Sequence, residues 1–213
     1  MPTTVWSNVA VAVQSALAGA VAITAISKAN PGVVSTGTTP TAGDYVLIAA
    51  QGMHQVDGRV FRVGTVVPAT SFQLEGEDTT GYDTFTTPGT YQVITFGTTV
   101  STVTGLTASG GEYEFDDTTT IHVAQRSQIP TVASALTYSM ESIWDPADTA
   151  QIALKAASEA KTTRAVRFTF ANGKKCLFNG YVGFTGVPTG TAQTKVICPL
   201  VFTVDRRVTN YAT

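Results

Sequence analysis

Residues 164–184 read RAVRFTFANGKKCLFNGYVGF, and this stretch predicts a β-hairpin. Apolar side chains alternate with polar ones along both halves, so each half turns one apolar face toward a core. The two faces consist of Val166, Phe168 and Phe170, then Cys176, Phe178, Val182 and Phe184. Between the halves stands Asn172-Gly173, a pair typical of a two-residue hairpin turn. We therefore expect two antiparallel strands with an aromatic-rich face.

A third strand is expected in residues 195–205, KVICPLVFTVD. One face is apolar at Val196, Cys198, Leu200, Phe202 and Val204. Ile197 and Val201 make the other face apolar as well, which predicts burial between two layers or at a subunit contact. Pro199 has no N–H to give to a ladder, so an edge or a bulge is expected beside it. Ile197 and Val201 are our candidate subunit-interface residues.

One helix is predicted before the hairpin, over about residues 146–160. Asp145 suits the N-cap, Pro146 suits the first helical position, and Asp148 stands where a capping box has an acid. A narrow apolar stripe at helical spacing supports the assignment. The stripe consists of Ile152, Ala153, Ala156, Ala157 and Ala160.

The first half of the chain reads as short strands separated by turns. Residues 22–96 contain runs such as GDYVLIA and DGRVFRVGTVV, with turn chemistry at Asn30-Pro31-Gly32 and Asp57-Gly58. Strands of this length and spacing predict a small barrel or sandwich. Residues 9–26 are apolar but rich in Ala and Gly, and no Lys or Arg precedes Lys28. This favours strand and turn, or a short helix, over a membrane span or a secretion signal, so we expect a protein that remains in the cytoplasm.

The composition excludes several classes of function. Only 13% of the 213 residues are charged and the net charge is −2. No basic stripe is present, so a free DNA-binding domain is not indicated. The only cysteines, Cys176 and Cys198, are 21 residues apart and far from His54 and His122, which gives no metal-ligand spacing. We expect free thiols rather than a disulfide, no cofactor, no catalytic motif, and His122 in a strand reading TTIHVAQ.

An acidic alternation in residues 112–117, EYEFDD, has two interpretations. Glu112, Glu114 and Asp116 would share one face of a strand. That face is either a solvated strand edge or an acidic wall along which DNA slides, because affinity for DNA comes largely from neutralised phosphates. These three residues are our candidates for a lumen-facing surface.

Residues 119–213 resemble the core of the lambda-type siphophage tail tube (major tail) protein. The resemblance rests on an ordered series: TTTIHVAQRSQIP, the strand ALTYSMESIWDP, the helix ADTAQIALKAASEA, the hairpin above and the final strand TKVICPLVFTVDRRV. It implies a β-sandwich or partly open barrel with one flanking α-helix, built from residues 1–21 and 97–213. It also implies hexameric rings that enclose a channel for the genome, and no active site.

Residues 22–96 resemble a second kind of unit, the small β modules of phage structural proteins related to the first catalytic cysteine half-domain (FCCH) of ubiquitin-activating enzymes. The matching pieces are AITAISKANPGVV, GDYVLI, VDGRVFRV and SFQLEGEDTTGY, in this order. The stretch has no cysteine, so no enzyme chemistry is carried over. We expect an inserted β-barrel-like module on the outer surface of the assembly.

The resemblances together predict a structural subunit of a long non-contractile phage tail tube. The expected partners are further copies of the chain, the tape measure, tail terminator and tail tip proteins, and double-stranded DNA that passes without specific binding. No membrane is involved, and the expected location is the virion tail, assembled in the host cytoplasm. The alternative is another virion module, such as a capsid decoration or a receptor-binding tail-tip protein.

Overall fold

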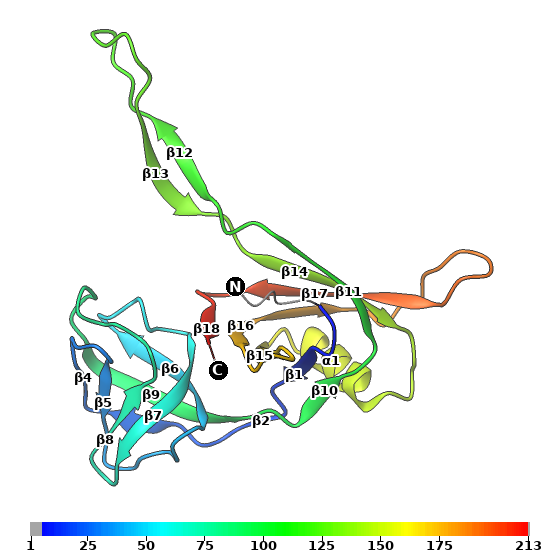
Figure 1. The fold of residues 1–213 in the computed structure, drawn as a ribbon, viewed down its shortest axis with the longest axis horizontal. Coiled ribbons are helices and arrows are strands. Elements are labelled where there is room, and N and C mark those ends of the chain that lie inside the picture. The colour runs from blue at the N-terminus through cyan, green and yellow to red at the C-terminus, as the bar shows by residue number, and fades with distance from the viewer. Residues whose placement is uncertain (1–5, 213) are drawn as a thin grey trace.

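The computed structural model describes residues 6–212 and is mainly β, as predicted. Three parts are visible in Figure 1: a body that carries the one helix, a small barrel, and a long two-stranded arm that projects from the body. The barrel and the arm leave the body in different directions. The predicted Val5–Gln14 strand begins outside the described residues, and within them it extends only over Ala10–Val13.

The body is one antiparallel sheet that curls around its core. The strands follow the order β10-β1-β15-β16-β17-β14-β11, and β18 pairs with one end of β16. The outermost strands β10 and β11 are joined by only two residues, so the two edges of the sheet meet at one end, as in a partly open barrel. The elements are β1 (Ala10–Val13), β10 (Thr98–Val100), β11 (Val103–Ser109), β14 (Thr137–Ile143), α1 (Thr149–Glu159), β15 (Thr163–Thr169), β16 (Lys175–Phe184), β17 (Ile197–Val204) and β18 (Thr209–Tyr211).

The predicted hairpin is the centre of the body core. β15 and β16 pair antiparallel with Val166 opposite Phe178 and Phe168 opposite Cys176. The rings of Phe168 and Phe178 are 5.6 Å apart, and Phe178 lies 6.1 Å from Phe202 of β17. The same core contains Met140, Leu154, Val182, Phe184, Cys198, Leu200 and Val204. The alternation read from residues 164–184 is therefore confirmed.

Two details of these strands were predicted wrongly. The hairpin loop has three residues, 171–173, because Thr169 pairs with Lys175 and the N–H of Phe170 donates to the carbonyl of Lys174. Gly173 has a φ of 83°, as expected of the left-handed residue that follows a type I turn in such loops. Val196 is 44% exposed because it lies before β17, in the loop where its carbonyl accepts a hydrogen bond from the N–H of Trp144.

The helix begins later than predicted, at Thr149. Asp148 is the N-cap, and its carboxylate accepts a hydrogen bond of 2.8 Å from the N–H of Ala150. Asp145 caps the preceding turn instead, where its carboxylate accepts from the N–H of Ala147. Both aspartates have capping chemistry, and the spacing alone does not show which of them starts the helix.

The buried stripe of the helix also differs from the predicted one. The buried residues are Ala150, Gln151, Leu154 and Ala157, whereas Ile152 is 56% exposed. Leu154 is the largest apolar side chain that the helix buries. The Gln151 amide donates a 2.6 Å hydrogen bond to the carbonyl of Ile143. The helix is therefore rotated to satisfy a buried amide, which the apolar pattern alone does not reveal.

The small barrel is a closed structure with its own core. Residues 21–26 bridge its edges, because β3 pairs with β9, β4 pairs with β5, and the N–H of Thr24 donates to Ser35. Closure removes exposed strand edges. The strands are β2 (Ala16–Leu17), β3 (Val21–Ile23), β4 (Ala25–Ile26), β5 (Val33–Ser35), β6 (Tyr45–Gln51), β7 (Val60–Val67), β8 (Ser71–Leu74) and β9 (Thr86–Thr95). The core includes Ile23, Val34, Val46, Ile48, Met53, Phe61, Phe72 and Tyr91.

A third apolar cluster joins the barrel to the body. Val60 and Ile94 of the barrel pack on Ala165, Leu177 and Tyr211 of the body. The guanidinium of Arg167 lies 5.1 Å from the ring of Tyr45 and 4.7 Å from that of Phe96, at the same junction. The barrel thus covers the side of β15 and β16 that faces away from the body core.

Candidate assembly surfaces

The arm is a two-stranded ribbon that no other part of the described chain covers. It consists of β12 (Tyr113–Asp117), β13 (Gln128–Ala133) and the tip loop between them. Every residue of both strands is exposed. The predicted strand TTIHVAQ is not present: His122 lies in the tip loop, because the chain reverses there and the N–H of Thr118 donates to the carbonyl of Ser127.

Two consecutive glycines set the direction in which the arm leaves the body. Gly110 and Gly111 have φ values of 82° and 83°, a region that glycine tolerates best. A Cβ atom on Gly110 would lie 2.1 Å from the carbonyl oxygen of Ala135. The N–H of Gly111 donates a 3.1 Å hydrogen bond to the carbonyl of Ser134, which ties the two chains of the arm together at its root.

The two faces of the arm differ in composition, because aromatic residues of β12 lie on one face and acidic residues on the other. Side chains alternate along β12, so Tyr113 and Phe115 share a face, and Phe115 pairs with Pro130. Tyr113 is 55% exposed and Phe115 is 63% exposed. By the same alternation Glu114 and Asp116 lie on the opposite face, where Asp116 pairs with Ile129, and Glu112 lies just before β12. The structure places the three residues on the arm; that they share one face, and that this face lines a lumen, both stay predictions.

The outward face of four body strands has an unusual composition. The register aligns residues of β11, β14, β17 and the second half of β16 across the side opposite the core. This hydroxyl face consists of Gly105, Thr107, Ser109, Thr137, Ser139, Glu141, Tyr181, Gly183, Pro199, Val201 and Thr203. It includes one charged residue, Glu141, where a protein surface of this size would carry about three.

The two candidate interface residues lie on this side of β17. Ile197 and Val201 are both half-buried, whereas Cys198 and Leu200 point into the core. Ile197 pairs with Ile143, which is 42% exposed, at the end of the sheet far from the arm. Val201 pairs with Ser139 in the middle of the hydroxyl face. Their role in subunit contacts stays a prediction.

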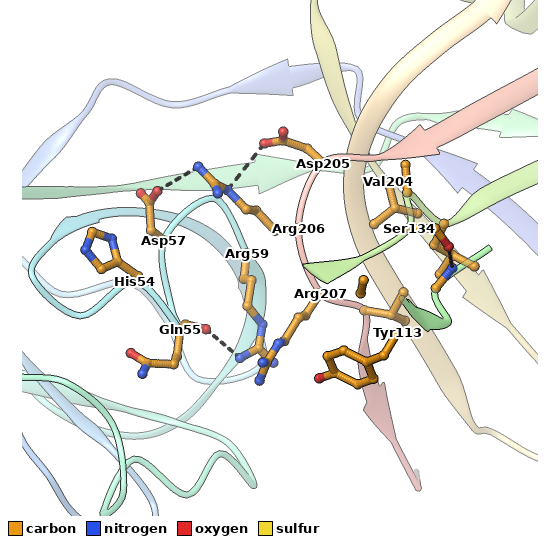
Figure 2. A pocket seen from close by; sticks show the side chains of 15 residues that line it. His54, Gln55, Asp57, Arg59, Tyr113, Ser134, Val204, Asp205, Arg206 and Arg207 are labelled. Carbon is orange, nitrogen blue, oxygen red and sulfur yellow. Dashed lines mark hydrogen bonds and ion pairs between the residues drawn. The ribbon is translucent and has the colours of Figure 1, made fainter. Parts of the chain in front are cut away.

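A cleft of about 780 Å³ lies where barrel, arm and body meet. Figure 2 shows its lining: residues 54–59 from the barrel, Tyr113 and Ser134 from the arm root, and residues 204–208 from the connection between β17 and β18. These segments are far apart in the sequence. Sequence reasoning missed the cleft, and no local pattern indicates it.

Three arginines border the cleft, and two of them are paired. Arg59 is buried and its guanidinium bonds the Glu77 carboxylate at 2.5 Å. Arg206 bonds Asp57 at 3.2 Å and lies 3.8 Å from the carboxylate of Asp205, as the dashed lines in Figure 2 mark. Arg207 is exposed and makes no hydrogen bond or ion pair within residues 6–212. Arg207 is therefore the one arginine of the lining that has no carboxylate partner within the described residues.

Burial keeps the thiols and two tyrosines protonated. Both cysteines are free in the structure. Desolvation raises the pKa of Cys176 to about 11, and burial also raises the pKa of Cys198. Desolvation raises the pKa of Tyr138 and of Tyr211 to about 12. These thiols are poor nucleophiles near neutral pH, because the thiolate is the reactive form.

No group of three His, Cys, Asp or Glu side chains in residues 6–212 is placed to hold a metal ion. Within the same range, no helix has the length and apolar character needed to cross a membrane.

Comparison with known proteins gives one family. A family model described as "Phage tail tube protein, TTP" matches residues 51–213, which run from the end of β6 through the arm and the body. A chain in the solved structure titled "Tail of empty GTA particle computed with helical refinement, C6 symmetry" is similar, with a TM-score of 0.41 and 14% identity over 54% of this chain and 85% of that chain. No curated protein sequence matches.

Proposed function

We propose, because this chain belongs to the phage tail tube protein family, that it forms hexameric rings which stack into a long non-contractile tube of the lambda-type siphophage kind. Membership makes the chain a structural component of the virion tail rather than an enzyme. The ring, its six-fold symmetry and the non-contractile type are our proposal. They are supported by the resemblance of residues 119–213 and by the surfaces described above.

The observation that carries the proposal is the uncovered arm. A two-stranded ribbon with water on both faces is marginally stable at best. This one also exposes the large side chains of Tyr113 and Phe115, and Ile121 at its tip is 96% exposed. Aromatic residues are enriched where proteins contact each other. A ribbon of this kind is expected to gain its partners when copies assemble. We propose that its tip reaches the adjacent ring.

We propose that the hydroxyl face lines the bore. A duplex adheres to a protein mainly through Lys and Arg contacts to phosphates, and this face has neither. Its hydroxyl groups and single carboxylate, Glu141, allow double-stranded DNA to pass without specific binding. This proposal moves Val201 from a subunit contact to the bore and keeps Ile197 as a contact residue at the far end of the sheet.

We propose that the small barrel, residues 22–96 in the sequence-based division, is a module on the outer surface of the tube, of the FCCH-like kind. Its closed sheet and separate core support a self-contained unit. The barrel and the arm leave the body in different directions, so the barrel does not occupy the direction in which the arm extends. The tape measure, tail terminator and tail tip proteins are the partners that the family resemblance implies.

An arm-less variant tests the proposal. Gly111 and Ser134 are already hydrogen-bonded, so residues 112–133 can be replaced by an Asn-Gly turn without moving the body. We expect this variant to remain a folded monomer and to form no tubes, whereas the unchanged protein forms tubes at high concentration in electron micrographs. Ile152→Asp, at an exposed position of α1 outside the arm, is the control and should still form tubes. Tubes of normal length from the arm-less variant would contradict the proposal.

A further inference from the structure

We infer that the cleft at the root of the arm receives the acidic face of β12 from a second copy of this chain, its lateral neighbour in the same ring. The inference rests on the proposed ring and goes beyond it, because it names the two surfaces that join neighbouring subunits. It also gives Glu112, Glu114 and Asp116 a protein partner in place of the bore.

The cleft contains a cation without a partner, next to a buried arginine. Arg207 is exposed and has no partner in its own chain within the described residues. Beside it lies Arg59, which is 6% exposed and whose Nε has no hydrogen-bond partner, although its terminal nitrogens bond Glu77, Gln55 and Thr209. Figure 2 shows the side chains of Arg59 and Arg207 extending into the same region. A carboxylate that enters the cleft would find donors there.

The arm supplies the complementary charge. Between residues 112 and 133 it has four carboxylates, Glu112, Glu114, Asp116 and Asp117, and one guanidinium, Arg126, a balance of −3. None of the four carboxylates forms an ion pair within the described chain. Opposite charges on two surfaces steer association and select the register in which they meet.

Rotational symmetry places these two surfaces at the same height. Gly111 lines the cleft, and Asp116 follows it five residues later, so the acidic face lies within about 16 Å of the cleft along the strand. Copies in a ring are related by rotation about the tube axis, which leaves the height of every atom unchanged. The acidic part of one arm therefore lies at nearly the level of the cleft of its neighbour. The tip of the arm extends farther and remains available for the next ring.

Charge reversal with rescue tests the inference. Arg207→Glu places like charges opposite each other and should raise the protein concentration needed for tubes by more than tenfold. Glu114→Arg with Asp116→Arg should have the same effect, because the reversed arm then meets Arg207. Equal amounts of the two variants should assemble together, since each reversed surface then meets an opposite one. Native mass spectrometry of the mixed rings should show three copies of each variant in a hexamer.

The control is Lys161→Glu, which reverses an exposed charge that has no ion pair and lies outside the cleft. It should assemble like the unchanged protein, and circular dichroism should show that every variant is folded. Normal tubes from Arg207→Glu would overturn the inference while leaving the proposed function intact. Variants that fail singly and also fail when mixed would overturn the pairing of cleft and arm. An unchanged protein that never forms rings would instead count against the proposed function.

Discussion

The backbone N–H of Arg62 in the barrel donates a 2.7 Å hydrogen bond to the hydroxyl oxygen of Tyr211 in β18 of the body. The Arg62 guanidinium also lies 4.8 Å from the centre of the Tyr211 ring. Tyr211 is buried at this junction beside Leu177. Tyr211 thus accepts a hydrogen bond from a backbone N–H of the barrel and also packs in the apolar contact between barrel and body.

Alkaline pH should destabilise the fold through buried acids that keep their protons. The pKa of Tyr211 and of Tyr138 is about 12 in the folded state and 10.0 ordinarily, and that of Cys176 is about 11 instead of 9.0. Between these values the unfolded chain has lost protons that the folded chain retains. These three groups should therefore leave the free energy of unfolding level from neutral pH to about pH 9 and lower it from about pH 9 to 12.

Urea unfolding at a series of pH values measures this dependence. Tyr211→Phe removes one of the three groups and should make the decline shallower. It also leaves the N–H of Arg62 without its acceptor, at a cost of about 1–3 kcal/mol near neutral pH. Tyr181→Phe, on the exposed hydroxyl face, is the matched control and should change neither quantity. Unfolding that is independent of pH up to 12 would contradict the assigned burial of these groups.

The double glycine at the arm root should tolerate alanine unequally. Gly110→Ala adds strain at a φ of 82° and a 2.1 Å clash with the backbone of Ala135, so we expect a loss of stability of about 1–3 kcal/mol and poor tube formation. Gly111→Ala meets nothing closer than 3.6 Å and should show the φ strain alone. Thermal unfolding and electron microscopy of the two variants measure the difference. Equal stability and equal tube formation of the two variants would show that the close approach at Gly110 does not set the direction of the arm.

Strand alternation and turn chemistry predicted much of the body. The apolar faces of residues 164–184 and of β17 follow from a period of two, and these strands contain most of the core. The start of the helix was predicted three residues early, because Asp145 and Asp148 are equally suited to capping. The arm was missed because alternation of Glu and aromatic residues indicates a strand without showing whether anything covers it.

The cleft was beyond the reach of sequence patterns for a different reason. Asp57 and Arg206 form an ion pair, yet 149 positions separate them in the chain. Hydrophobic periodicity describes one element at a time, so it does not place residues of the barrel beside the connection from β17 to β18. The hydroxyl face could be predicted only in part from the sequence. The polar side of each strand follows from its alternation, but the alignment of the strands comes from the sheet register.

Lysines on the hydroxyl face should make the tube bind DNA. Thr107 and Ser139 are register partners on adjacent strands, so Thr107→Lys with Ser139→Lys places two cations side by side in the proposed bore. Co-sedimentation of such tubes with a short duplex should show binding in the non-specific range, with a Kd of about 10⁻⁴–10⁻⁶ M, that weakens as salt rises. The unchanged tubes should bind little. Ala153→Lys on the exposed side of α1 is the control.

The proposed bore would be wrong if the two lysines left DNA binding unchanged while tubes still formed. Failure of the double variant to form tubes would point instead to a contact between subunits on this face. A single Ser139→Asn variant, which is uncharged and intermediate in size between serine and lysine, should assemble in either case and separates charge from packing effects.

Removal of the barrel should give a thinner tube only if the apolar body surface that the barrel covers is made polar. The N–H of Gly97 donates to the hydroxyl of Ser15 at 3.0 Å, so a short Gly/Ser linker can replace residues 16–96. The replacement starts at Ala16 because β2 pairs only with β9. It exposes Leu177, which is fully buried beneath the barrel. We expect Leu177→Thr to be needed for solubility, because an uncovered apolar patch promotes aggregation.

Size-exclusion chromatography and microscopy of the barrel-less protein, with and without Leu177→Thr, give the result. Tubes of smaller outer diameter and unchanged bore support an outward module. Because residues 54–59 of the barrel also line the cleft, we expect these tubes only at a higher protein concentration than the unchanged protein needs. Loss of all tubes from soluble, folded protein would show that the barrel belongs to the tube wall.

Electron cryomicroscopy of the purified protein across concentration and salt tests the central claim most directly. We predict tubes of constant diameter built from stacked rings with six-fold symmetry, in which the strands β11, β14 and β17 face an open channel. A protein that remains monomeric at high concentration under all conditions, or that forms only trimers, would contradict the account.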